Sequence, residues 1–145
     1  MNNATVLVVE DDEAERRLLC DFLRERRLHV DTARDGIEAL HQISSAAYDL
    51  ILLDVMMPGM SGVDFLDSLR ALSNDPSVKA VEKLPAVIVI TAATDAALPN
   101  DAIQLRYPEV VRGIFRKPLD IQRLGACVGE VLRARGTQHL DTRHL

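Results

Sequence analysis

Three short runs of consecutive apolar residues, rich in Val, Ile and Leu, constrain the fold of this chain more than any other feature. They span residues 6–9, 50–53 and 87–90, and an acidic or hydroxyl residue follows each run. Strands that face solvent on one side alternate apolar and polar residues, whereas strands covered on both faces are apolar throughout. The runs therefore predict the central strands of a parallel sheet.

Between and after these runs lie four segments in which apolar residues recur at helical spacing. Asp12 followed by Glu15 predicts the start of the first helix, and Ser61 and Asp120 predict the starts of the third and the last. The apolar positions that show this spacing are Ala14, Leu18 and Phe22; Ile37, Leu40 and Ile43; Val63, Leu66, Leu69 and Leu72; and Ile121, Leu124, Val128, Val131 and Leu132.

Two weaker strand signals, at residues 29–33 and 113–115, complete an alternating order of five strands and helices. Parallel strands need crossover connections, and these connections are right-handed, so helices come to lie on both faces of the sheet. The sequence therefore predicts an α/β fold with a doubly wound, five-stranded parallel sheet. Such sheets bind ligands beyond the carboxyl ends of their strands, where the strand order reverses.

Two segments fit this pattern poorly. Residues 74–84 lengthen one connection, and residues 95–111 contain two prolines, which predict a short or irregular fourth helix. We assign residues 1–135 to a single domain. Residues 136–145 are polar and lack periodicity, so we expect them to form a frayed C-terminal tail.

Composition excludes several classes of function. A chain of 145 residues, 48% of them hydrophobic, can bury one core, and its net charge of -5 argues against direct nucleic-acid binding. Cys20 and Cys127 lie too far apart in sequence to suggest a zinc site or a disulfide framework. The longest apolar run, residues 86–90, is too short to cross a bilayer, and the first residues lack a basic targeting region. We therefore expect a cytoplasmic protein without membrane insertion.

Three carboxylates stand directly after two of the predicted strands. Glu10 and Asp11 follow the first run and Asp54 follows the second, so in adjacent parallel strands all three meet at one edge. Any one of them alone would be interpreted as a helix cap or a solvated loop residue. Crowded like charges raise a pKa or recruit a cation, and an oxygen-only site suits Mg²⁺. We leave Asp12 outside this site because its side chain is expected to cap the first helix.

A carboxylate beside a divalent cation can attack a phosphoryl donor and form a mixed anhydride. Asp54 is the candidate nucleophile. Two further residues at strand ends can stabilise charge on the phosphoryl oxygens: Thr91 offers a hydroxyl donor, and Lys117 offers a compact cation. Taken singly, Thr91 and Lys117 would be interpreted as an ordinary strand end and a surface lysine; their combination with the acids favours phosphoryl transfer.

Four segments carry a family resemblance: VVED at 8–11, LLDVMMPGMSG at 52–62, ITA at 90–92 and RKP at 116–118. They resemble the signatures of bacterial two-component response-regulator receiver domains, of the single-domain type similar to the chemotaxis response regulator. The resemblance covers nearly the whole chain. It implies a flavodoxin-like fold with strand order 2-1-3-4-5.

The resemblance also implies a metal site. Asp11, Asp54 and the backbone carbonyl of Met56 would bind Mg²⁺, and Glu10 would reach the ion through a water molecule. Asp54 would be the phosphoacceptor, while two other residues, Thr91 and Lys117, would contact the phosphoryl oxygens. The peptide bond between Lys117 and Pro118 would be cis.

Partners follow from the same resemblance. The phosphoryl donor would be a phosphohistidine on a sensor histidine kinase or a histidine phosphotransfer protein, and the signal would pass to a downstream protein target. The domain would be a monomer or weak homodimer. It would not be an enzyme, since it would catalyse only its own phosphorylation and a slow autodephosphorylation. Fewer than two dozen residues follow Gly125, so we expect output through protein contacts and no DNA-binding domain within this chain.

One departure from the family pattern bears on signalling. Receiver domains often carry a Tyr or Phe three residues before the lysine, where this chain has Ile114, so the switch region of Thr91 and Ile114 lacks its aromatic ring. A pseudo-receiver, a binding module that works without phosphorylation, is the main alternative. A phosphohydrolase would need a second acid where Met56 stands, and a nucleotide-binding domain would need a glycine-rich loop after the first strand.

Overall fold

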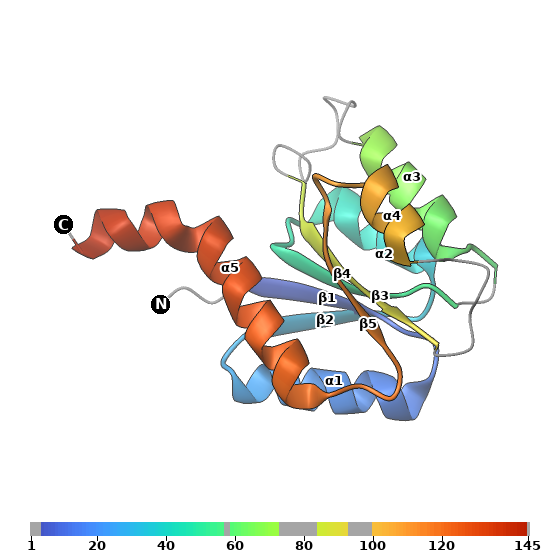
Figure 1. The fold of residues 1–145 in the computed structure, drawn as a ribbon, viewed down its shortest axis with the longest axis horizontal. Coiled ribbons are helices and arrows are strands. Elements are labelled where there is room, and N and C mark those ends of the chain that lie inside the picture. The colour runs from blue at the N-terminus through green and yellow to red at the C-terminus, as the bar shows by residue number, and fades with distance from the viewer. Residues whose placement is uncertain (1–3, 57–58, 73–83, 93–99, 145) are drawn as a thin grey trace.

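A computed structural model describes residues 4–56, 59–72, 84–92 and 100–144, with residues 100, 101 and 136–144 described by their backbone alone (Figure 1). Predictions for the connections around residues 74–83 and 93–99, including Pro99, lie outside the described residues. No helix within the described ranges is long and apolar enough to cross a membrane.

The sheet is five-stranded and parallel, with the order β2-β1-β3-β4-β5. Both the predicted fold class and the predicted strand order are confirmed. The strands are β1 (Thr5–Val9), β2 (His29–Ala33), β3 (Leu50–Asp54), β4 (Ala86–Thr91) and β5 (Val111–Arg116). The two central strands β3 and β4 are buried along their whole length, as their continuous apolar runs predicted.

Helices cover both faces of the sheet (Figure 1). One face carries α1 (Glu13–Glu25) and α5 (Ile121–His144), whose side chains pack against alternate residues of β1, β3 and β4. The opposite face carries α2 (Gly36–Ser45), α3 (Gly62–Leu72) and the short α4 (Asn100–Arg106). Two hydrophobic cores thus lie on opposite faces of the sheet.

The predicted helix starts are confirmed. The side chain of Asp12 accepts the Glu15 N–H at 2.9 Å, Ser61 accepts the Asp64 N–H, and Asp120 accepts two N–H groups at the start of α5. The fourth helix is short, with 7 residues, as its flanking prolines predicted.

The apolar spacing noted for α1 does not match its buried face, and on α2 it holds for Leu40 and Ile43 but not for Ile37. Leu18 on α1 is 55% exposed and Ile37 on α2 is 59% exposed, whereas Leu19, Cys20 and Leu23 form the buried face of α1. Apolar residues stand at three consecutive positions, 18 to 20, so the spacing alone allowed two positions of the apolar stripe.

The predicted end of the last helix is also wrong. The helix α5 continues through Gly136 to His144 instead of fraying after residue 135, and its last turns extend beyond the sheet (Figure 1). No proline follows Asp120 in the chain, and a single glycine costs a helix only about 1 kcal/mol.

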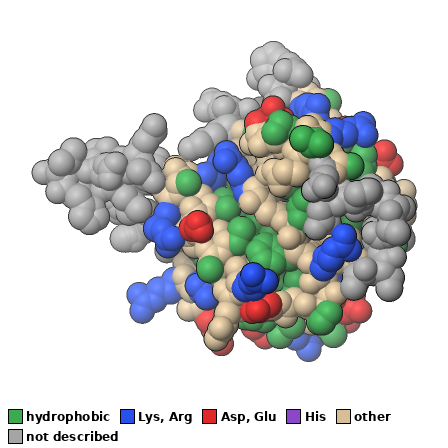
Figure 2. Space-filling view, viewed as in Figure 1, with side chains coloured by type: hydrophobic (Ala, Val, Ile, Leu, Met, Phe, Trp, Pro, Cys, Tyr) green, Lys and Arg blue, Asp and Glu red, His purple; other side chains and the backbone are tan. Residues whose placement is uncertain are grey.

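The strand β5 forms one edge of the sheet between α4 and α5. Figure 2 shows hydrophobic side chains gathered in the middle of this face, with Lys and Arg side chains around them. Leu105 of α4 is 79% exposed, and Ile114 and Phe115 of β5 are half-buried. This face, α4-β5-α5, is distinct from the carboxyl ends of the strands.

Candidate functional site

The acidic residues that follow β1 and β3 meet at the carboxyl edge of the sheet. The register pairs Val9 with Leu53, so Glu10 and Asp54 leave neighbouring strands at the same level. One carboxylate oxygen from each of Glu10, Asp11 and Asp54 lies within 4.8 Å of the others. The three acids that the sequence predicted to converge are therefore brought together.

Glu10 is the most confined of the three acids. Its Oε2 accepts the Asp12 N–H at 3.1 Å, whereas its buried Oε1 accepts no hydrogen bond from the described residues. Burial raises the pKa of Glu10 to about 8, and the neighbouring Asp54 carboxylate adds to this rise. The hydrogen bond from the Asp12 N–H and the charge of Lys117 act in the opposite direction and lower this pKa. An unsatisfied carboxylate oxygen in an oxygen-only cluster fits a hard divalent cation such as Mg²⁺.

Asp54 is held at the end of β3 by its surroundings. Its side chain is 4% exposed, its Oδ1 accepts the Met56 N–H at 2.9 Å, and its Oδ2 lies 3.3 Å from Lys117 Nζ. The Val55 N–H donates to the Ile90 carbonyl at 3.1 Å, which keeps the chain in line with β4 for one residue beyond the strand. This carboxylate is therefore fixed beside a cation.

Lys117 follows β5 and reaches back across the site. Its N–H donates to the Thr91 carbonyl at 2.9 Å, and its peptide bond to Pro118 is cis, as the family resemblance implied. Burial acts to lower the pKa of Lys117, but the hydrogen bond to Glu15 and the nearby carboxylates outweigh burial and raise it. Lys117 is therefore a fixed positive charge at neutral pH.

Sequence reasoning missed one member of this site. Lys117 Nζ lies 3.0 Å from Glu15 on α1, closer than it lies to Asp54 at 3.3 Å or to Glu10 at 3.6 Å. Glu15 was expected to close the capping box of α1. A signal was available, because Glu15 is an acidic residue in the first turn of the helix that directly follows the acid pair.

Thr91 is the last residue of β4 and is buried. Its hydroxyl donates to the Ala92 carbonyl at 3.4 Å, and the register places its neighbour Ile90 opposite Asp54. Ile114 pairs with Val89 further down the sheet and packs against the core under α2, α3 and α4. Thr91 thus lies at the carboxyl edge with the acids, whereas Ile114 lies two residues before the end of β5.

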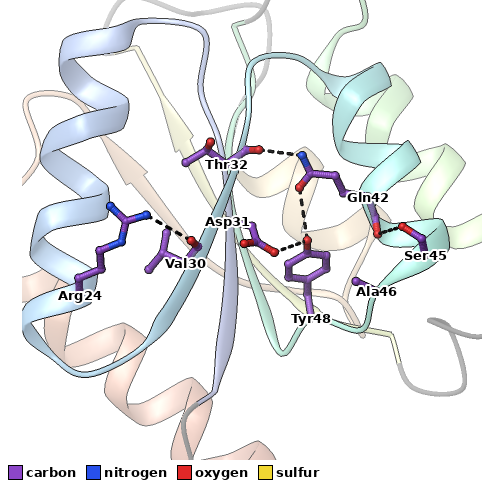
Figure 3. A pocket seen from close by; sticks show the side chains of 8 residues that line it. All are labelled: Arg24, Val30, Asp31, Thr32, Gln42, Ser45, Ala46 and Tyr48. Atoms are coloured by element: carbon purple, nitrogen blue, oxygen red, sulfur yellow. Dashed lines mark hydrogen bonds between the residues drawn. The ribbon is translucent and has the colours of Figure 1, made fainter.

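A pocket of about 460 Å³ lies elsewhere, at the β2 edge of the sheet (Figure 3). Its polar groups bond to one another: Tyr48 donates to Asp31 at 2.8 Å, and Gln42 donates to the Thr32 carbonyl at 2.8 Å. None of the acids of the carboxyl edge lines it. The lining residues are Arg24, Val30, Asp31, Thr32, Gln42, Ser45, Ala46 and Tyr48.

Comparison with known proteins gives one consistent result. Residues 6–128 match the family model of the response regulator receiver domain. Sensory transduction protein RegX3 of Mycobacterium tuberculosis is 33% identical over 132 residues, covering 91% of this chain and 52% of that protein. The transcriptional regulatory protein CpxR homolog of Haemophilus influenzae is 35% identical over 115 residues, covering 77% and 50%. The chain spans about half the length of the curated relatives it matches.

Solved structures agree with the family model. The chemotaxis protein CheY4 of Vibrio cholerae superimposes with a TM-score of 0.72 at 27% identity, covering 90% of this chain and 99% of that one. A response regulator receiver protein from Pseudomonas putida gives a TM-score of 0.72 over 90% and 98% of the two chains, and at 24% identity it supports the fold alone. Receiver domains are regulators of two-component systems rather than conventional enzymes, and phosphorylation of an aspartate and Mg²⁺ binding are typical of them. The chain belongs to the response regulator receiver domain family.

Proposed function

We propose that this domain accepts a phosphoryl group on Asp54 from a phosphohistidine of a sensor histidine kinase or a histidine phosphotransfer protein. The observation that carries the proposal is the confinement of Asp54: it is buried, belongs to a cluster of three acids and lies 3.3 Å from Lys117 Nζ. Such an arrangement is unfavourable for three carboxylates alone and favourable for receiving a phosphoryl group with its cation.

The reaction forms one bond and breaks one. An Asp54 carboxylate oxygen bonds to phosphorus while the bond from phosphorus to the histidine nitrogen breaks, and the imidazole leaves with the electron pair. Asp11, Asp54 and the Met56 carbonyl would hold Mg²⁺, with Glu10 reaching it through water. The bound ion would neutralise charge on the phosphoryl oxygens. Two residues of the chain, Thr91 as hydroxyl donor and Lys117 as cation, would contact those oxygens.

Loss of the phosphoryl group would be slow, because the chain offers no dedicated second acid beside Asp54 on its own strand and Met56 occupies that position. Thr91 and Ile114 would form the switch region, and the α4-β5-α5 face would contact a downstream protein target. We further propose a cytoplasmic receiver domain at residues 1–135, acting as a monomer or weak homodimer, and a C-terminal segment at 136–145.

An intact-mass measurement after incubation with acetyl phosphate and Mg²⁺ tests the proposal. We expect one added phosphoryl group on the parent protein and none on Asp54→Asn. The matched control is Asp64→Asn, which makes the same change at an exposed residue of α3 and should label like the parent. Labelling of Asp54→Asn at the parental level would show that another residue is the nucleophile.

The alternative is a pseudo-receiver that binds its partner without phosphorylation. The observation that favours it is Ile114, which packs against the core where many receivers carry a mobile aromatic ring. An unchanged mass of the parent protein in the same experiment would support this alternative.

A further inference from the structure

Among the residues that the structure describes, the carboxylate nearest to Lys117 belongs to α1 and not to the acid cluster. Lys117 Nζ lies 3.0 Å from Glu15 Oε1 and 3.3 Å from Asp54 Oδ2. We propose that Glu15 is a positioning residue, which holds Lys117 toward α1 in the unphosphorylated state and competes with the phosphoryl group for the ammonium. This inference rests on the proposed function and adds a residue to it.

The start of α1 explains why the Glu15 carboxylate is available. In a complete capping box the third helical residue returns its side chain to the N–H of the capping residue. Here the Asp12 N–H already donates to Glu10 Oε2 at 3.1 Å. The Asp12 side chain still accepts the Glu15 N–H at 2.9 Å, so the backbone of Glu15 is fixed while its carboxylate turns to Lys117.

The remaining charges near the site do not replace this contact. Arg16 directs its guanidinium to backbone, since Nη1 donates to the Glu10 carbonyl at 3.0 Å and to the Asp11 carbonyl at 3.4 Å. Glu13 pairs with Arg17 at 3.3 Å on the solvent side of α1. Of the described cations, Lys117 is thus the one whose charged group lies within 4 Å of side-chain carboxylates of the cluster.

Phosphorylation of Asp54 would add competitors for the hydrogen bonds that the Lys117 ammonium donates. The ammonium carries three N–H donors, and three carboxylates within 3.6 Å now share them. A phosphoryl group on Asp54 adds new anionic oxygens that need the same donors. Because the backbone of Glu15 is fixed in the first turn of α1, stronger contact with the phosphoryl group weakens the contact with Glu15. The Glu15–Lys117 pair therefore opposes phosphorylation and links the site to α1.

The size of the effect follows from the exposure of the pair. The side chains of Glu15 and Lys117 are 25% and 27% exposed, so solvent screens their attraction. Pairs of this kind contribute little individually, and their loss corresponds to a change of about two- to fivefold in an equilibrium constant. We expect Glu15→Gln to bind a phosphoryl mimic more tightly by this factor.

The experiment compares the affinity for beryllofluoride, a phosphoryl mimic, at saturating Mg²⁺ by calorimetry on the whole chain. Glu13→Gln is the matched control, because it removes the same charge from the same turn of α1 at a residue that pairs with Arg17 and not with Lys117. We expect about two- to fivefold tighter binding for Glu15→Gln and parental binding for Glu13→Gln. Glu15→Ala provides a second variant if Glu15→Gln fails to fold, which thermal unfolding reports.

The outcomes separate this inference from the proposed function. If the parent neither binds the mimic nor takes a phosphoryl group from acetyl phosphate, the proposed function fails and the role of Glu15 fails with it. If the parent binds but Glu15→Gln and Glu15→Ala bind equally or more weakly, only the role of Glu15 is overturned. Equal tightening by Glu13→Gln would also overturn it, because the effect would then come from the general charge of α1.

Discussion

Replacing Gly62 by alanine tests how tightly the loop after Asp54 is packed. A Cβ atom on Gly62 would lie 2.5 Å from Val55 Cγ1, 2.6 Å from Val55 Cβ and 2.8 Å from Val55 Cα. Carbon atoms in proteins do not approach this closely, and the Val55 Cα is part of the backbone that leaves β3. The Gly62 N–H also donates to the Val55 carbonyl at 3.3 Å, so both ends of the loop are joined at this point.

The expected cost of Gly62→Ala is that of overpacking. Forcing a methyl group into a filled site destabilises the folded state by about 1–3 kcal/mol. The lower conformational entropy of the unfolded chain with alanine stabilises the protein by only about 0.4–1 kcal/mol. We therefore expect a net loss of about 1–2 kcal/mol in the free energy of unfolding, or roughly 2–8 °C in Tm. Displacement of Val55 would also shift Asp54 and Met56 beside it, so Mg²⁺ affinity should fall.

Thermal and urea unfolding of Gly62→Ala and Gly129→Ala measure this prediction. Gly129 lies inside α5, and the atom nearest to its added Cβ is Arg133 Nη1 at 3.3 Å, the end of a flexible side chain. The same substitution there should stabilise the protein by about 0.5–1 kcal/mol, because alanine favours the helix. Equal or greater stability of Gly62→Ala would refute the packing argument for the loop.

Three further predictions concern other parts of the chain. The pKa of Tyr107 is raised to about 12 by burial and by its 2.6 Å hydrogen bond to Asp67, so this tyrosine stays neutral to a higher pH in the folded state than when unfolded. Its contribution to stability is complete below about pH 10 and is lost between pH 10 and 12; Tyr107→Phe should cost about 1 kcal/mol at pH 7 and show a smaller alkaline loss in urea unfolding. Asp11→Ala should lower Mg²⁺ affinity by more than about tenfold in calorimetry, and equal affinity would place the metal elsewhere. Thr91→Ala should remove the phosphorylation-dependent change in amide hydrogen exchange on α4, whereas an unaltered change would exclude Thr91 from the switch.

The fold and the acid cluster could be predicted from sequence because both follow from strand geometry. Continuous apolar runs fix which strands are central, and parallel strands place the residues that follow them at one edge. The proximity of Glu10 and Asp54 could be predicted from the ends of the two apolar runs alone. The positions of β3 and β4 differ from the predicted runs by one residue at most at either end.

Helix burial and the end of α5 depend on information that local patterns do not carry. The three apolar residues at positions 18 to 20 permit two orientations of α1, and packing against the sheet selects the one that buries Leu19 and Cys20. The polar composition after residue 135 suggested fraying, yet without a proline or a turn sequence nothing in the backbone stops the helix.

The role of Glu15 was missed for a different reason. A side chain at a strand end is placed by the sheet, but a side chain in the first turn of a helix is placed by competition among hydrogen bonds. Sequence spacing predicted a capping box, in which Glu15 would bond to the Asp12 N–H. The Glu10 carboxylate takes that N–H instead, because burial leaves Glu10 few other donors, and Glu15 is then left to pair with Lys117. The surroundings of Glu10 in the folded chain therefore decide which acid accepts the Asp12 N–H and which acid contacts Lys117. Local spacing cannot reveal such contacts, since Lys117 and Asp54, which also meet here, are sixty-three positions apart in the sequence.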